Sequence, residues 1–209
     1  MIADPLPPAF YPVSLNLVGR RCVVIGDDRE AIEKEAALRE VGADVHWIRD
    51  PAAVRDDDIA AAFFVISTPQ DAVLSARLRS LADAHRVLLC CIDQPAFGFV
   101  AMTAIVKAGP ARIAISTGGV APRVGKMLKE ALERAMDGKF ERFIDCLATQ
   151  RRRNRARLPG SAERRAAMMR SAAGFTADVR FTYPAWYEDE CRALGPTIDE
   201  TSVETTGRS

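Results

Sequence analysis

The sequence predicts an α/β fold built on a Rossmann-like parallel sheet. Short β-branched and apolar runs alternate with amphipathic helical patterns through the first 115 residues. This alternation is typical of a parallel sheet covered by helices on both faces. The first apolar run ends in a glycine and leads straight into a helical pattern, which is the order strand, turn, helix.

The expected elements follow in order from residue 20. "RRCVVIG" predicts a first strand, and a helix follows over residues 29–41. "GADVHWI" and "AAFFVIS" predict the second and third strands, a helix spans 70–85, and "VLLCCI" predicts a fourth strand. We expect "ARIAIS" as a fifth strand of the sheet, followed by a helix over 123–136 whose apolar residues form one stripe.

The remainder of the chain changes character and becomes helical and arginine-rich. It carries no strand signal, and "LPGS" is expected to join two helices. The final "PTIDETSVETTGRS" is polar and terminal, so fraying is expected there.

Composition and charge exclude several classes of function. The chain has 209 residues and a formal net charge of +1 at pH 7, so no global field attracts nucleic acid or an anionic membrane. Arginines gather at 151–157 and again at Arg164, Arg165 and Arg170, without interleaved aromatic residues, which favours a solvated helix face. No apolar run approaches the roughly 20 residues that span a bilayer, and the N-terminus lacks a signal-peptide pattern. We expect neither nucleic acid nor a membrane as partner.

The cysteines and histidines indicate a reducing cytoplasm and no metal site. Five cysteines occur without a CxxC pair, which fits a compartment that keeps thiols reduced. His46 and His85 lie far apart and lack ligand-like spacing, and no serine or cysteine nucleophile motif is evident.

The turn "GDD" after the first strand bears on nucleotide binding. In dinucleotide-binding folds the first glycine makes a tight turn, and the second lets a pyrophosphate approach the helix N-terminus. Gly26 keeps the turn, but Asp28 stands at the second glycine position and Asp27 lies between them. Two carboxylates repel a diphosphate, whereas either one caps a helix beginning near Arg29. The cap is expected with or without a nucleotide.

Asp93 follows the fourth predicted strand and precedes Gln94 and Pro95. Open α/β sheets place their sites at this carboxyl edge. A buried or half-buried carboxylate there acts as a general base, with a pKa raised by burial. The alternative is an Asp-initiated turn before proline.

A second glycine turn, "STGGVAP", joins the fifth predicted strand to the next helix. Its backbone N–H groups can bind a carboxylate or a phosphate. The alternative, compatible with the first, is a helix N-cap with Pro122 near the first helical position.

Four stretches resemble the dehydrogenase and chelatase module of siroheme synthases, that is, precorrin-2 dehydrogenase/sirohydrochlorin ferrochelatase. They are "YPVSLNLVGRRCVVIG", "KEAALREVGADV", "CCIDQPAFGF" and "TAIVKAGPARIAISTGGVAPRVGKMLKEALE". Together they cover roughly residues 10–135, and the last stretch is the longest and most specific.

The resemblance implies an organisation and a set of site residues. It implies a Rossmann-like domain over 1–115, a dimerisation region over 116–140 and a helical domain over 141–209, in a homodimer that binds a tetrapyrrole. Members oxidise precorrin-2 to sirohydrochlorin with NAD, and some then insert ferrous iron. Asp93 falls on the family's essential aspartate, a base acting on the macrocycle. The implied cofactor-binding residues are Gly26, Asp28, Arg29, Glu30, Asp50, Pro51 and Thr68, and the implied substrate-binding residues are Ser116, Thr117, Gly118, Gly119 and Arg123.

Three departures from the family pattern leave alternatives open. Gly26-Asp27-Asp28 replaces three glycines, and only "RDPAAVRDDDIA" connects the second and third strands, where the family has room for a helix and another strand. Cys90 and Thr103 replace an asparagine and a proline. The hypotheses are therefore an NAD-dependent precorrin-2 dehydrogenase, a chelatase or related enzyme that has lost NAD, and a non-catalytic tetrapyrrole-binding dimer.

Overall fold

A four-stranded parallel sheet organises the first part of the chain. The computed structural model describes residues 10–194, and it divides into two compact units, 1–148 and 149–209, which are treated separately. The sheet has the order β2-β1-β3-β4. Its strands are β1 (Arg21–Ile25), β2 (Asp44–Ile48), β3 (Phe64–Ser67) and β4 (Leu88–Cys91). The Rossmann-like fold class predicted from the sequence is confirmed.

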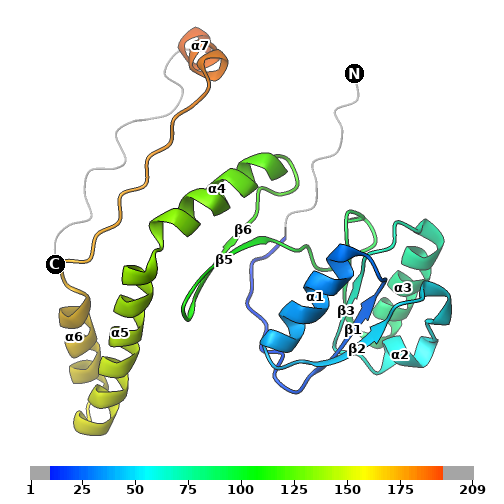
Figure 1. Ribbon diagram of the computed structural model, residues 1–209, viewed down its shortest axis with the longest axis horizontal. Coiled ribbons are helices and arrows are strands. Elements are labelled where there is room, and N and C mark those ends of the chain that lie inside the picture. The colour runs from blue at the N-terminus through cyan, green and yellow to red at the C-terminus, as the bar shows by residue number, and fades with distance from the viewer. Residues whose placement is uncertain (1–9, 195–209) are drawn as a thin grey trace. The chain divides into compact units, whose positions relative to one another are not determined.

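Helices cover both faces of this sheet (Figure 1). Helix α1 (Arg29–Glu40) packs on the face formed by the β1 residues Cys22 and Val24. Helices α2 (Asp56–Ala60) and α3 (Ala72–His85) pack on the opposite face, against Val23 and Ile25. Alternate residues of one buried strand thus serve two hydrophobic cores, which is why its sequence is continuously apolar. A 3₁₀ turn, η1 (Pro51–Ala53), and the short α2 fill the connection between β2 and β3.

The fifth strand was wrongly assigned to the parallel sheet. The segment Ala111–Ile115 forms β6, which pairs antiparallel with β5 (Ala104–Ala108) in a separate two-stranded sheet. Strand β5 was not predicted at all. Its apolar run is short and lies just ahead of a glycine turn at Gly109 with φ +55°, which is the geometry of a hairpin.

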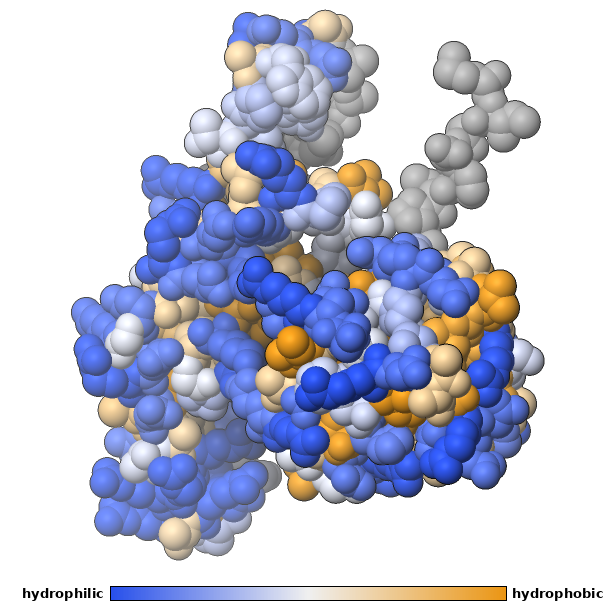
Figure 2. Space-filling model, turned by 45° about the vertical axis from the view of Figure 1, so that its right-hand side comes forward, coloured by the Kyte–Doolittle hydropathy of each residue, from blue (hydrophilic) through white to orange (hydrophobic). Residues whose placement is uncertain are grey.

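The helical remainder follows the predicted pattern. Helices α4 (Pro122–Ala135), α5 (Gly138–Arg157), α6 (Ser161–Ala172) and α7 (Ala185–Leu194) complete the described chain. The stretch "LPGS" joins α5 to α6 as expected, and no strand occurs in the described residues after 135. The polar tail at 196–209 lies outside the described residues. On the face shown in Figure 2, hydrophilic side chains predominate and hydrophobic ones form small separate patches.

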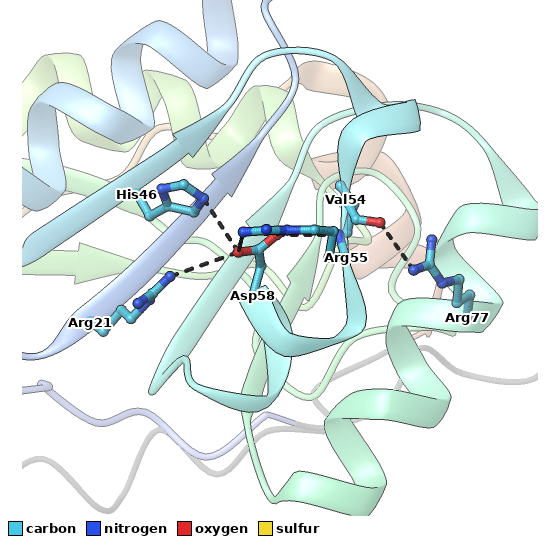
Figure 3. Close-up of polar contacts among 6 residues, drawn as sticks. All are labelled: Arg21, His46, Val54, Arg55, Asp58 and Arg77. Atoms are coloured by element: carbon cyan, nitrogen blue, oxygen red, sulfur yellow. Dashed lines mark hydrogen bonds and ion pairs between the residues drawn. The ribbon is translucent and has the colours of Figure 1, made fainter.

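One buried carboxylate fixes α2 to the sheet (Figure 3). Asp58 is 3% exposed, and it is the only charged side chain that is buried among residues 10–194. Arg55 donates to both of its oxygens, from Nε at 3.1 Å and from a terminal nitrogen at 3.0 Å. Arg21 on β1 and His46 on β2 approach it at 3.8 and 3.6 Å. Hydrogen bonding from Arg55 holds the pKa of Asp58 below its usual range.

Candidate functional site

The carboxyl ends of β1, β3 and β4 bring three of the predicted site residues to one edge of the sheet. Gly26 follows β1, Thr68 follows β3 and Asp93 lies two residues after β4. Because the three strands are adjacent and parallel, their ends meet at one edge.

Gly26 makes the tight turn that its position predicts. Its φ is +120°, and a Cβ placed there would lie 2.3 Å from the Thr68 hydroxyl oxygen. The Gly26 N–H donates to the Ile48 carbonyl at 3.0 Å, and its own carbonyl accepts from the Trp47 indole at 2.7 Å. Backbone conformation and close packing both require glycine here.

Asp28 caps helix α1, so the predicted cap is confirmed. Its carboxylate accepts from the Ala31 N–H at 2.8 Å. A hydrogen bond from the Thr68 hydroxyl, followed by the one from Ala31, holds the pKa of Asp28 below its usual value. The Ala31 N–H, which could otherwise donate to a phosphate oxygen, already donates to an anionic partner. The Gly26 turn fits a dinucleotide, but the Asp28 carboxylate does not fit a pyrophosphate.

The other predicted cofactor residues are engaged locally. Asp50 caps η1 by accepting from the Ala52 N–H at 3.0 Å, and Pro51 begins that turn. Arg29 has a side chain that is 93% exposed and pairs with Glu33 at 2.9 Å. Glu30 instead belongs to the pocket beside Asp93.

Asp93 is exposed, so the expectation of a buried or half-buried carboxylate is wrong. Its backbone has φ +57°, a left-handed conformation that aspartate tolerates better than most residues. It lies inside a turn closed by the Gln94 N–H, which donates to the Cys91 carbonyl at 3.2 Å. The turn is therefore formed by the backbone and does not start at Asp93. It lifts the carboxylate out of the sheet core to a pocket.

This pocket, which we call the Asp93 pocket, has a volume of about 330 Å³. One wall comes from α1, one from the end of β4, and one from the segment that returns toward β5. Its lining residues are Glu30, Lys34, Cys90, Cys91, Ile92, Asp93, Pro95, Val100, Ala101, Met102 and Thr103. Burial is the main reason that the pKa of the Cys90 thiol is raised to about 12. The thiol is therefore protonated at neutral pH and unsuited to act as a nucleophile.

Two glutamines fix the strand ends around the site, and neither was predicted from the sequence. The Gln70 side chain donates to the Ile92 carbonyl at 2.9 Å. The Gln94 side chain donates in the opposite direction, to the Pro69 carbonyl at 3.0 Å. The loops that carry Thr68 and Asp93 are thus tied together. An amide side chain just after each strand was the available signal.

The predicted substrate turn lies apart from the Asp93 pocket. Gly118 and Gly119 have φ values of +62° and +79°, and the Gly118 N–H donates to the Ser116 hydroxyl at 3.2 Å. Helix α4 begins with Pro122 at its first position, as predicted, but its N-cap is Ala121, so no side chain caps it. None of the turn residues from Ser116 to Gly119, nor Arg123, lines the pocket.

Neither a cluster of metal ligands nor a membrane-spanning helix is found in the part of the chain that the structure describes. No group of three or more histidine, cysteine or acidic side chains is placed to hold a metal ion between residues 10 and 194. Over the same range, no helix combines the length and the hydropathy needed to cross a membrane.

The fold and its glycine turn define a Rossmann-type domain, and comparison with known proteins agrees. Residues 13–104 match the model of a family described as putative NAD(P)-binding. The siroheme synthase of Nitrosococcus oceani is 28% identical over 174 residues, covering 75% of this chain and 37% of that protein. The siroheme synthase of Xylella fastidiosa is 30% identical over 179 residues, again covering 75% of this chain and 37% of that protein.

Solved structures show the same fold. SirC, a precorrin-2 dehydrogenase, superimposes with a TM-score of 0.61 at 18% identity, covering 77% of this chain and 88% of that one. The chain is therefore similar in sequence to part of these siroheme synthases, and it shares the fold of SirC. It spans about two fifths of the length of the siroheme synthases that it matches.

Proposed function

We propose that the protein is a tetrapyrrole-processing enzyme of siroheme biosynthesis, of the precorrin-2 dehydrogenase and/or sirohydrochlorin ferrochelatase type. The observation that carries the proposal is the Asp93 pocket, which presents an exposed carboxylate at the carboxyl edge of the sheet. The siroheme synthase relatives and the SirC structure support the substrate class.

Asp93 is proposed as the general base. No hydrogen bond or ion pair to its carboxylate is found among the described residues, so its oxygens remain available to a substrate proton. The glutamine pair and the backbone turn hold it at the pocket. Oxidation of the macrocycle and insertion of ferrous iron both require removal of protons from carbon or nitrogen, and one positioned base serves either reaction.

A second candidate, an NAD-independent chelatase with ferrous iron as substrate, is favoured by Asp28. The family match supports an NAD(P)-binding domain, and Gly26 retains the required turn. However, the Asp28 carboxylate lies at the N-terminus of α1, where it opposes a pyrophosphate. Metal insertion needs an anion-binding pocket and a base but no hydride acceptor. A non-catalytic tetrapyrrole-binding dimer is the remaining alternative.

A homodimer in the cytoplasm is part of the proposal. Helix α4 and its preceding turn leave Val120, Val124 and Met127 at least half exposed, as expected for the proposed dimerisation region over 116–140. The Rossmann-like boundary at 115 and the helical domain over 141–209 are likewise proposals. All five cysteines are free, which supports a reducing location. The glycine turn and Arg123 remain proposed ligands for substrate carboxylates.

The test compares turnover and sirohydrochlorin binding by Asp93→Asn with those of the matched control, Asp44→Asn. Asp44 is also exposed but lies at the first residue of β2, at the opposite end of the strands. We expect Asp93→Asn to lower the rate of precorrin-2 oxidation or of iron insertion about 100-fold or more. Either rate is measured by absorbance. Sirohydrochlorin affinity should change only a few-fold. Failure of the unaltered protein to bind sirohydrochlorin at micromolar concentration would overturn the proposal.

The same assays separate the three candidate functions. Precorrin-2 oxidation that depends on added NAD identifies the dehydrogenase. Iron insertion without any NAD-dependent oxidation identifies the chelatase. Tetrapyrrole binding without either reaction identifies the non-catalytic dimer.

A further inference from the structure

We propose that Lys34 is a substrate-binding residue of the Asp93 pocket, and that Glu30 competes with the substrate for it. The ligand group would be a carboxylate. The inference rests on the proposed function, because it assumes that the pocket receives a polycarboxylate macrocycle.

The burial of Lys34 is the first observation. Its side chain is only 21% exposed, the lowest value for any basic side chain in the ion pairs found between residues 10 and 194. Lysine side chains are mostly exposed in folded proteins, so this degree of burial is unusual. Lys34 also lines the Asp93 pocket. A partly buried cation at a pocket wall is suited to bind a ligand carboxylate.

The position of Lys34 is the second observation. It lies one helical turn after Glu30 on α1, and both residues line the wall that faces the end of β4. The charges of Lys34 and Glu30 both act on the Cys90 thiol, with opposite effects on its pKa. Cys90 precedes Asp93 by three residues, so an acid group held by Lys34 would anchor the substrate in the same pocket as the proposed base.

The partner of Lys34 is the third observation. Its ammonium pairs with Glu30 at 3.1 Å, and the Glu30 side chain is 42% exposed. Ion pairs spaced four residues apart on a helix contribute little to stability. A substrate carboxylate can therefore displace Glu30, which turns toward water, while Lys34 keeps a charged partner throughout.

A second pair on the same helix supplies a matched control. Glu35 and Arg39 have the same spacing and form an ion pair, and the Arg39 side chain is 57% exposed. Neither lines the pocket. Neutralising Arg39 removes a positive charge from α1 without touching the proposed subsite or a proposed cofactor residue.

The experiment measures sirohydrochlorin affinity of the full chain by absorbance titration at several salt concentrations. We expect Lys34→Met to bind roughly tenfold to a hundredfold more weakly, as for loss of a hydrogen bond to a charged group. Its affinity should also fall less steeply with salt. Lys34→Arg should retain most of the affinity, and Glu30→Gln should bind a few-fold more tightly. Arg39→Gln should match the unaltered protein.

The outcomes separate this inference from the proposed function. If the unaltered protein binds sirohydrochlorin and Lys34→Met binds it equally well with the same salt dependence, the Lys34 inference is overturned and the proposed function stands. Equal weakening in Lys34→Met and Arg39→Gln would also overturn it, since the effect would then be one of net charge. If the unaltered protein does not bind sirohydrochlorin, both proposals are overturned.

Discussion

Replacing Asp28 with glycine is expected to tighten NAD binding about tenfold. The substitution removes the carboxylate that accepts from the Ala31 N–H at 2.8 Å and releases that donor at the N-terminus of α1. Glycine also supplies the residue that dinucleotide-binding turns have at this position. The backbone of Asp28 is extended, with φ −72°, so the change introduces no strain.

The expected magnitude follows from charge repulsion at an exposed site. Two unit charges about 4 Å apart in water interact by about 1 kcal/mol. A pyrophosphate brings more than one charge, so removal of Asp28 should contribute about 1 to 2 kcal/mol, or roughly tenfold in affinity. The cost to folding is small, because glycine is an acceptable N-cap and replaces aspartate at a loss of about a few tenths of a kcal/mol.

Asp71→Gly is the matched control. Asp71 caps α3 by accepting from the Val73 and Leu74 N–H groups at 2.9 and 3.1 Å. That variant also loses one helix cap and one negative charge, but at the N-terminus of α3, and its NAD affinity should not change. The two variants should have similar free energies of unfolding in urea.

Calorimetric titration with NAD measures the effect, and pH supplies an independent check. The pKa of Asp28 is lowered in the folded protein. Its cap therefore stabilises the fold above the unfolded-state pKa near about 4 and is lost as pH falls through the lower folded-state pKa. The difference in NAD affinity between Asp28→Gly and the unaltered protein should shrink over the same pH range. Equal NAD affinities of these two proteins at neutral pH would refute this account of Asp28.

Two further predictions concern stability and thiol chemistry. Asp58→Asn should destabilise the fold by about 2 kcal/mol, because Arg55 loses its charged partner. The loss should disappear as pH falls through the lowered pKa of Asp58, and urea unfolding at pH 7 and pH 3 checks this. A thiol reagent at pH 8 should rapidly label only Cys146 and Cys191, which are exposed. Fast labelling of a third cysteine without denaturant would contradict the burial of Cys22, Cys90 and Cys91.

The parallel sheet was predictable because each of its strands can be recognised from its own residues. In β1, Val23 and Val24 are both fully buried on opposite faces, so the strand reads as one continuous apolar run. The β5–β6 hairpin was not predictable in the same way. A short apolar segment such as Ala111–Ile115 does not specify its pairing partner, which tertiary structure decides.

The site was partly predictable for a similar reason. A residue that follows a strand, such as Asp93, is placed at the carboxyl edge by topology alone. Its exposure depends on the left-handed turn at φ +57°, which the sequence does not specify. Lys34 lines the same pocket as residues 100–103, which lie far along the chain. Single-residue exposure of this kind arises from long-range packing.

The Asp28 cap also determines how the protein behaves when no nucleotide is present. Because the carboxylate is attached to the chain one turn from the amide that it binds, it acts as an intramolecular ligand at a high effective concentration. The α1 N-terminus is therefore satisfied without any cofactor. We therefore expect the folding of this edge, and access of the proposed macrocycle to the Asp93 pocket, to be independent of nucleotide concentration.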